Sequence, residues 1–232
     1  MGQMPARGWF RSMRILIINP NSTWAMTNKI GDCARQVMSE DTTIEAVNPP
    51  DGPAAIQGEQ DGIDALPHLF ELFDRMTSGG QYDAVIVACF DDTGLLELKQ
   101  RSQIPVVGIG EAAFHAAALL GGKFSVVTTL SVSCPIIEAN LTSYGFSKHV
   151  AGVRASEVPV LAFEDRPDQS YRALSAEIEL SIKQDKIRSV VLGCAGMTDL
   201  AVKLSKQHSV PVIDGVRAAV GLVEMMDKTL PK

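Results

Sequence analysis

Short apolar segments alternate with longer amphipathic segments along the chain. Four of the apolar segments are rich in β-branched residues and end at Gly, Pro or polar residues, which is typical of buried strands. They comprise residues 14–19, 42–47, 84–89 and 104–109. Two segments between them place apolar residues at helical spacing, namely Met26, Ile30, Cys33 and Val37, and then Ile63, Leu66, Phe70, Phe73 and Met76. The alternation predicts an α/β fold, with mostly parallel strands flanked by helices.

The second half of the chain repeats the pattern of the first half. The segment AVIVACFDDTGL (84–95) is echoed by SVVLGCAGMTDL (189–200). Fifteen residues after Cys89 the chain reads IPVVGIGEAAFHAAALL, and sixteen residues after Cys194 it reads VPVIDGVRAAVGLVEMM. One repeat of about a hundred residues predicts two pseudo-symmetric lobes, each a mostly parallel sheet flanked by helices, with the functional site in the cleft between them.

The repeat also suggests where each lobe begins and ends. We predict that the first lobe comprises residues 14–110 and 216–232, and that the second comprises residues 111–215. The first 13 residues are basic but lack the apolar stretch of a secretion signal, so they are expected to be an extension.

Composition narrows the classes of function. The chain has 232 residues, of which 46% are hydrophobic and 21% charged, as in a globular protein with a full core. Acidic residues outnumber basic ones 27 to 21 without a dense basic stripe, so neither nucleic acid nor a membrane is an expected partner. Four cysteines in a chain without a recognisable secretion signal indicate reduced thiols, which predicts a cytoplasmic protein. None forms a C-x-x-C pair, so neither a zinc ribbon nor a thioredoxin-type motif is expected.

Two of the cysteines hold equivalent positions in the repeat. Cys89 and Cys194 each end an apolar strand before a helix, and the carboxyl ends of parallel strands are where α/β proteins place their chemistry. A helix N-terminus stabilises a thiolate. One thiolate could remove a proton from one face of a carbon while the other thiol protonates the opposite face, so that the stereocentre inverts. Strand-end hydroxyls such as those of Thr93, Thr128 and Thr129 could stabilise the enolate oxygen.

Four motifs, NPNST, ACFDDTGL, VVTT and LGCAGM, occur in an order and spacing that resemble the aspartate/glutamate/hydantoin racemase superfamily, and most closely its hydantoin and allantoin racemase branch. The resemblance covers the chain from about residue 14. It implies two α/β lobes, racemisation by two cysteines without a cofactor, and a homo-oligomer. By motif, Cys89 and Cys194 would be the catalytic acid/bases. Other motif residues would contact the substrate, namely Asn19, Asp91, Asp92, Thr93, Thr128, Gly193 and Ala195.

The chain departs from the amino-acid racemases of this superfamily beside both cysteines. Those enzymes have Asn-Thr after the first cysteine and Thr-His after the second, whereas this chain has Phe90-Asp91 and Ala195-Gly196. Asp91 and Asp92 would repel an α-carboxylate but would accept hydrogen bonds from the N–H groups of a neutral ureide. The expected substrate is therefore a small neutral hydantoin-type ring, either allantoin or a 5-substituted hydantoin. The FDD sequence resembles the allantoin racemases more than the alkylhydantoin ones.

Several alternatives remain open at this point. An aspartate or glutamate racemase would share the two thiols, a decarboxylase or cis–trans isomerase would be a more distant relative, and a non-catalytic binding protein would need neither thiol. The two aspartates could simply be helix-start residues. Cys33 and Cys134 are interpreted as structural, and the loop 52–58 as a wall or lid of the site.

No cofactor or metal site is predicted. The segment GIGEAA (108–113) matches a dinucleotide-binding pattern, but no acidic residue follows at the required distance. A metal held by Cys89 and Cys194 would lack further ligands.

Overall fold

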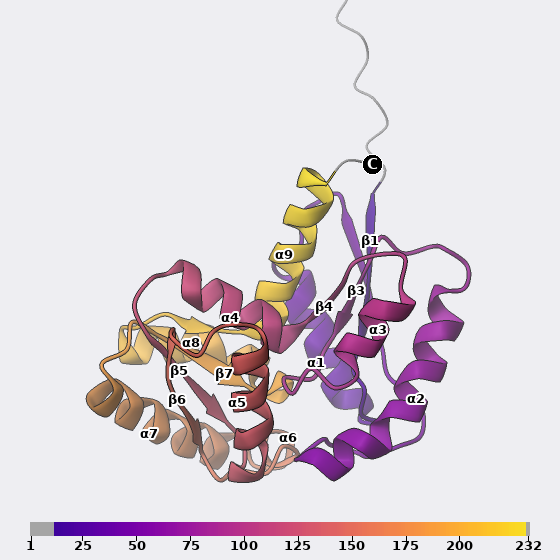
Figure 1. Cartoon of the computed structure of the whole chain (residues 1–232). Helices are drawn as coiled ribbons and strands as arrows, with labels where there is room; N and C mark the ends of the chain where they lie inside the picture. Colours follow the sequence, from indigo (N-terminus) through magenta and orange to yellow (C-terminus); the bar gives the residue numbers. More distant parts are fainter. Residues whose placement is uncertain (1–11, 231–232) are drawn as a thin grey trace, which may run out of the picture.

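The computed structural model describes residues 12–230, which form two lobes, each built on a parallel four-stranded sheet (Figure 1). The first sheet has the order β2-β1-β3-β4 and contains β1 (Met13–Ile18), β2 (Thr42–Val47), β3 (Ala84–Val87) and β4 (Val106–Gly108). The second has the order β6-β5-β7-β8 and contains β5 (Phe124–Thr128), β6 (Val150–Ala155), β7 (Ser189–Gly193) and β8 (Val212–Ile213). Both lobes place their strands in the same chain order, which confirms the predicted two-lobed α/β fold.

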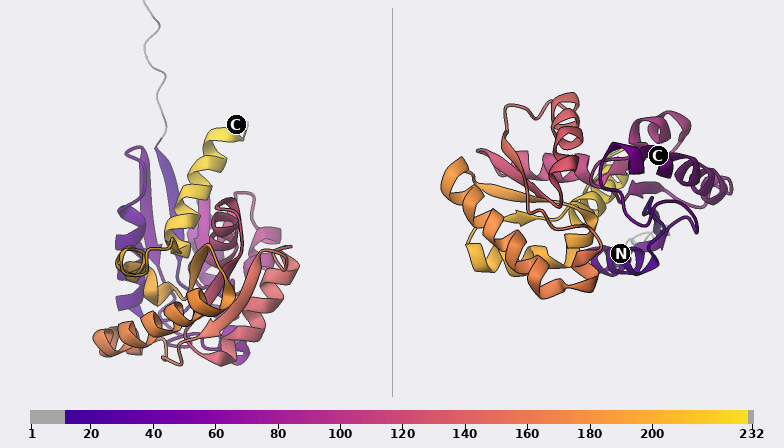
Figure 2. Two further views of the ribbon diagram at one scale, coloured as in Figure 1. Left: turned by 90° about the vertical axis from the view of Figure 1, so that its left-hand side faces the viewer. Right: turned by 90° about the horizontal axis from the view of Figure 1, so that it is seen from below.

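Helices lie on both sides of each sheet (Figure 2). The first lobe contains α1 (Trp24–Arg35), α2 (Glu59–Thr77) and α3 (Leu95–Arg101). The second contains the 3-10 helices η1 (Ser131–Ser133) and η2 (Ala195–Leu200), and the helices α5 (Cys134–Ser143), α6 (Ala162–Asp165), α7 (Pro167–Asp185) and α8 (Ala201–His208). Within residues 12–230, no helix combines the length and the apolarity that crossing a membrane requires.

Strand β1 shows why both faces of the first sheet are covered. Ile15 and Ile17 pack into one apolar cluster together with residues of α1, whereas Leu16 and Ile18 pack into another with residues of α2. All four side chains are fully buried. Successive side chains of a strand point to opposite faces, so this continuous apolar segment requires a helical layer on each side.

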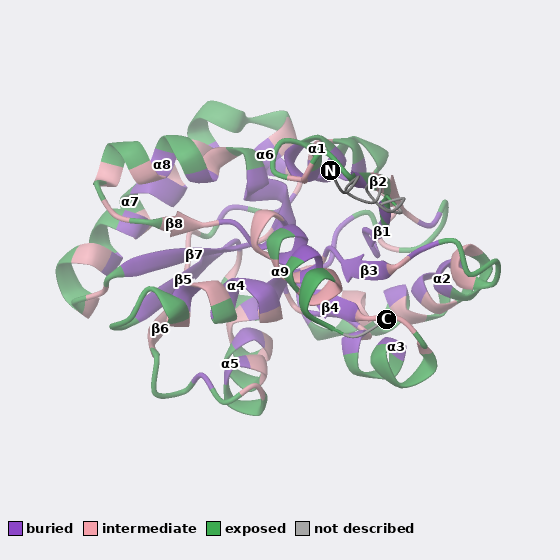
Figure 3. Ribbon diagram, turned by 90° about the horizontal axis from the view of Figure 1, so that it is seen from above, coloured by how far each residue is buried: buried purple, intermediate pink, exposed green. Residues whose placement is uncertain are grey.

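Helices α4 (Ile109–Leu119) and α9 (Gly215–Thr229) occupy equivalent positions after the last strand of each lobe and pack against each other. Each also contacts strands of both sheets, and α9 runs through the centre of the molecule (Figure 3). The predicted lobe boundaries at residues 110 and 215 fall at the starts of these helices, and the assignment of each helix to one lobe stays a prediction.

Some element boundaries and faces differ from the sequence-based expectation. Strand β1 begins at Met13, which pairs with Thr42, so this residue is not part of an extension. Residues 1–11 of the predicted extension lie outside the described residues. Val37 follows the end of α1 and is exposed.

In α2 the buried face agrees only in part with the predicted one, since Phe73 is buried and Phe70 and Met76 pack partly buried against the same cluster. Ile63 is 51% exposed, and the buried positions are Ala65, Leu69, Leu72 and Phe73. Two apolar stripes overlap on this helix, and the stripe that packs is the one that reaches the side chains of β1 and β3.

Candidate active site

A pocket lies between the lobes, at the carboxyl ends of the strands of both sheets. It is compact, with a cavity volume of about 30 Å³. Its walls come from strand ends, from α1 and from loops, and comprise Asn21, Met26, Ile56, Ala88, Cys89, Phe90, Asp91, Thr128, Thr129, Ser133, Val160, Gly193, Cys194 and Ala195. A site at this edge is expected for parallel sheets, because loops at the carboxyl ends of strands converge there.

The two strand-end cysteines line this same pocket. Cys89 follows β3 and Cys194 follows β7, the equivalent strands of the two sheets. The Thr93 hydroxyl donates a hydrogen bond to Cys89 Sγ, and the Gly196 N–H donates one to Cys194 Sγ, each at 3.4 Å. Both bonds favour a thiolate. The fold thus gives each sulfur one hydrogen-bond donor from the segment that follows it.

Burial opposes ionisation of both thiols. It raises the pKa of Cys194 to about 12, and the Asp91 carboxylate adds to this while Lys29 and the Gly196 N–H act against it. The pKa of Cys89 lies well above its ordinary range, because the sulfur is buried and because Asp91 is close. Burial and the nearby Asp91 carboxylate thus both favour the protonated form of each thiol. The negative charge of Asp91 acts on both of them.

Asp91 itself lines the pocket with an unsatisfied carboxylate. Its Oδ2 is buried and has no hydrogen-bond partner among the described residues, and burial raises its pKa to about 7. Its backbone carbonyl accepts a hydrogen bond from Asn140 Nδ2 at 2.8 Å, which holds the loop in place. A buried acceptor without a donor costs free energy, so this carboxylate is suited to bind the N–H groups of a ligand.

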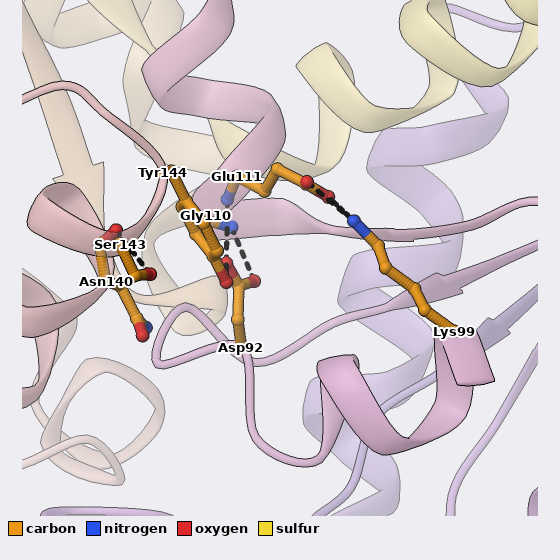
Figure 4. Close-up of polar contacts among 7 residues, drawn as sticks. All are labelled: Asp92, Lys99, Gly110, Glu111, Asn140, Ser143 and Tyr144. Atoms are coloured by element: carbon orange, nitrogen blue, oxygen red, sulfur yellow. Dashed lines mark hydrogen bonds and ion pairs between the residues drawn. The ribbon is translucent and has the colours of Figure 1, made fainter.

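Asp92 has a different role from the one predicted. It does not line the pocket, because its φ of +51° directs the carboxylate toward α4. There it accepts hydrogen bonds from the N–H groups of Gly110 (3.0 Å) and Glu111 (2.8 Å) and from the Tyr144 hydroxyl (3.1 Å) (Figure 4). Burial raises its pKa to about 7 despite these donors. Asp92 is a cap of the first turn of α4, and its carboxylate is fully occupied.

Asn19 also lies outside the pocket lining, and the residue two positions later takes its place. Asn19 is fully buried behind the site, where its side-chain amide donates to Asn21 Oδ1 (2.9 Å) and Thr27 Oγ1 (3.0 Å). Asn21 lines the pocket. Both residues belong to the NPNST motif, so the motif indicated the correct strand end without separating the supporting residue from the one that lines the pocket.

The remaining predicted residues lie at or beside the pocket. Thr93 contacts the Cys89 sulfur but does not line the cavity, whereas Thr128, Thr129, Gly193 and Ala195 do. The Thr128 hydroxyl donates to the Gly193 carbonyl at 2.8 Å, which joins the ends of β5 and β7. A Cβ on Gly193 would lie 2.7 Å from Thr128 Cβ, so the close approach of these strand ends requires glycine.

Several lining residues were not predicted. They come from the end of β3, from α1, from η1 and from loops, and they are Asn21, Met26, Ala88, Phe90, Ser133 and Val160. Ile56 belongs to the loop 52–58, which forms a wall as expected. The Val160 N–H donates to Gln57 Oε1 at 2.9 Å, so loops from the two lobes meet beside the pocket.

The other two cysteines lie apart from the pocket lining. Cys33 packs in the buried face of α1, and Cys134 begins α5 next to a lining residue without lining the pocket itself. Within the described residues, no group of three or more His, Cys, Asp or Glu side chains could hold a metal ion.

Comparison with known proteins identifies the family of the chain. Residues 15–223 match the sequence model of the Asp/Glu/Hydantoin racemase family. The chain belongs to this family. A hydantoin racemase of Rhizobium meliloti is 42% identical over 214 residues, which cover 92% of this chain and 88% of that protein.

Two solved structures of family members are similar over nearly the whole chain. The allantoin racemase from Klebsiella pneumoniae has 40% identity and a TM-score of 0.90, with 94% of this chain and 88% of that chain covered. The allantoin racemase from Pseudomonas fluorescens has 36% identity and a TM-score of 0.89, with 93% and 91% covered. The chain is accordingly an isomerase of the racemase type, and the alternative of a non-catalytic binding protein is set aside.

Proposed function

We propose that this racemase inverts the stereocentre of small neutral hydantoin-type rings, either allantoin or 5-substituted hydantoins, with Cys89 and Cys194 as its two acid/base groups. The observation that carries the proposal is that two thiols from equivalent strand ends line one pocket, together with a buried carboxylate oxygen of Asp91 that has no partner. The similar hydantoin and allantoin racemases support the substrate class.

The proton balance closes with protein groups alone. The thiolate of one cysteine removes the proton from the ring carbon, and the electron pair of the C–H bond moves onto the adjacent carbonyl to form an enolate. The thiol of the other cysteine then protonates the opposite face of that carbon. The first cysteine ends as a thiol and the second as a thiolate, so the next turnover of the opposite enantiomer begins with the roles exchanged.

Asp91 links substrate binding to thiol activation. A ureide N–H that donates to Asp91 Oδ2 satisfies a buried acceptor and spreads its negative charge. That charge raises the pKa of both thiols, so its partial neutralisation makes a thiolate easier to form. An amino acid would bring an α-carboxylate into the same pocket, where Asp91 would repel it. The site therefore favours a neutral ring.

We further infer that the enzyme works without a cofactor, as a homo-oligomer in the cytoplasm. The four cysteines are all free, as expected for a reducing compartment. Light scattering of the purified protein tests the assembly.

The decisive experiment follows the optical rotation of enantiopure allantoin and of 5-substituted hydantoins in deuterated water. Rotation should decay to zero while deuterium enters the stereocentre. Cys89→Ser and Cys194→Ser should each abolish full inversion, whereas Cys134→Ser, which alters a cysteine outside the pocket lining, should retain it. Wild-type inversion in either pocket variant would reject the mechanism. Inversion of aspartate or glutamate alone would reject the substrate class.

A further inference from the structure

An enolate intermediate requires a hydrogen-bond donor at the carbonyl oxygen. The pocket is lined by the Thr129 and Ser133 hydroxyls and by the side-chain amide of Asn21, and the amide is the donor whose direction the hydrogen-bond network fixes. Two other donors near the cysteines are already engaged. The Thr128 hydroxyl is bonded to the Gly193 carbonyl, and the Gly196 N–H points to Cys194 Sγ. Asn21 Nδ2 has a weaker partner, since it donates to the thioether sulfur of Met26 at 3.3 Å. A thioether is a poor acceptor, so this N–H is easily redirected to a ligand oxygen.

The orientation of the Asn21 amide is fixed by its oxygen. The backbone N–H of Thr23 donates to Asn21 Oδ1 at 3.0 Å, and a backbone N–H can act only as a donor. The assignment of oxygen and nitrogen therefore follows from the hydrogen-bond network. Asn19 Nδ2 donates to the same oxygen at 2.9 Å. With both donors on Oδ1, the NH₂ group is held on the other side of the amide, toward Met26.

A buried chain of hydrogen bonds makes this arrangement rigid. Asn19 Nδ2 also donates to Thr27 Oγ1 at 3.0 Å, and Thr27 Oγ1 donates to Asn48 Oδ1 at 2.7 Å. Asn19 and Thr27 are almost completely buried. A donor fixed in this way does not have to reorganise when charge develops next to it, which is the condition for effective stabilisation of an oxyanion.

Asn21 and Asp91 together match the edge of a cyclic ureide. Asn21 follows β1 and Asp91 follows β3, and these strands are neighbours in the first sheet. The pocket thus receives a fixed N–H donor and an unsatisfied carboxylate acceptor from adjacent strand ends. A ring amide presents the complementary pair, a carbonyl oxygen next to an N–H.

We propose that Asn21 is a catalytic residue whose Nδ2–H donates to the carbonyl oxygen beside the stereocentre and stabilises the enolate, while Asn19 orients it. This role rests on the proposed racemase mechanism. The bond is strongest when the oxygen is anionic, so Asn21 acts mainly on the chemical step and less on ground-state binding.

The test uses two changes: the isosteric Asn21→Asp, which keeps an oxygen for Thr23 and Asn19 but replaces the donor with a carboxylate oxygen that can carry a negative charge, and a shorter neutral variant that carries no such charge. We expect kcat for a hydantoin-type substrate to fall on the order of 100-fold or more, with a much smaller change in KM. The smaller variant Asn21→Ser, which shortens the side chain, should show the same loss in kcat. Ser22→Ala is the matched control, because the Ser22 hydroxyl is bonded to the backbone of the 52–58 loop and does not line the pocket. Thermal unfolding of each variant verifies that it is folded.

The result that would overturn the inference is a kcat within about threefold of wild type in both folded Asn21 variants, or an effect confined to KM. This outcome is distinct from failure of the mechanism itself, which the cysteine variants test. If Cys89→Ser and Cys194→Ser are inactive while the Asn21 variants turn over normally, only the role of Asn21 is rejected. If the cysteine variants racemise at the wild-type rate, the mechanism is rejected and the role of Asn21 with it.

Discussion

Replacing Asp91 by Asn should stabilise the protein and impair it as an enzyme. The carboxylate is buried with one oxygen lacking any partner among the described residues, and burial is the sole cause that raises its pKa from 3.8 to about 7. The folded protein therefore binds a proton that the unfolded chain releases as the pH rises between these values. The contribution of Asp91 to the stability of the wild-type protein falls across this window and is constant above it. The Asn variant has no such titration.

The size of the effect follows from the two pKa values. A change of one unit corresponds to about 1.4 kcal/mol, so the difference of about three units amounts to about 4 kcal/mol. The free energy of unfolding of the variant, minus that of wild type, should grow by about this amount between pH 4 and pH 8. Burial also raises the pKa of Asp92 to about 7 and that of Asp214 to about 6. Both are present in each protein, so their contributions cancel in the difference.

Urea unfolding at several pH values, at one protein concentration, measures this difference. Asp64→Asn, which removes an exposed carboxylate from α2, corrects for the change in net charge. The variant should also lose kcat/KM toward ureide rings, because the acceptor for the substrate N–H is gone. A stability difference that stays flat with pH would refute the buried, unpaired carboxylate. Wild-type activity in a stabilised variant would refute its role in binding.

Three further substitutions test the surrounding structure. Asp92→Ala removes three hydrogen bonds at the start of α4, and urea unfolding should show that the free energy of unfolding falls by about 2–4 kcal/mol. An unchanged urea midpoint would argue against the role of Asp92 as a cap of α4. Gly110→Ala places a Cβ 2.4 Å from the carbonyl oxygen of Phe90, so the loop that carries Cys89 has to shift. In initial-rate assays kcat/KM should therefore fall at least about tenfold, and wild-type rates would show that this loop adapts without moving the thiol. Gln57→Leu leaves the Val160 N–H unpaired, and hydrogen exchange there should accelerate roughly tenfold, the equivalent of about 1.4 kcal/mol; unchanged protection would mean that the bond is dispensable.

The features that the sequence predicted correctly are those encoded locally or by duplication. The strands predicted from the sequence are short segments rich in β-branched residues whose neighbours supply their boundaries, and the repeated segments around Cys89 and Cys194 occupy the same place in both sheets. Two residues at equivalent sites of facing lobes converge for a geometric reason. Their meeting in one pocket could therefore be predicted from one chain.

The features that escaped prediction depend on contacts between distant segments. Asp92 looks the same in sequence as Asp91, and only its left-handed backbone and the approach of α4 separate the cap from the pocket residue. Asn19 and Asn21 differ in the same way, because Asn19 donates a hydrogen bond to the Thr27 hydroxyl and is thereby held behind the pocket. Ile63 fits an apolar stripe of α2, but the sheet contacts a neighbouring stripe of that helix. The local sequence pattern alone does not distinguish between these alternatives.

The contact between α4 and α9 has a consequence for any motion of the two lobes. Small side chains fill much of it, including Ala112, Ala113 and Ala117 of α4, and Val216, Ala219, Val220 and Val223 of α9. Both helices also touch strands of each sheet. A change in the distance between the two sulfurs therefore requires α4 and α9 to move relative to each other. Short side chains form low ridges, which permit sliding at a smaller cost than pulling apart. Sliding of α4 along α9 is thus the displacement by which the two lobes could move to admit and release a ring.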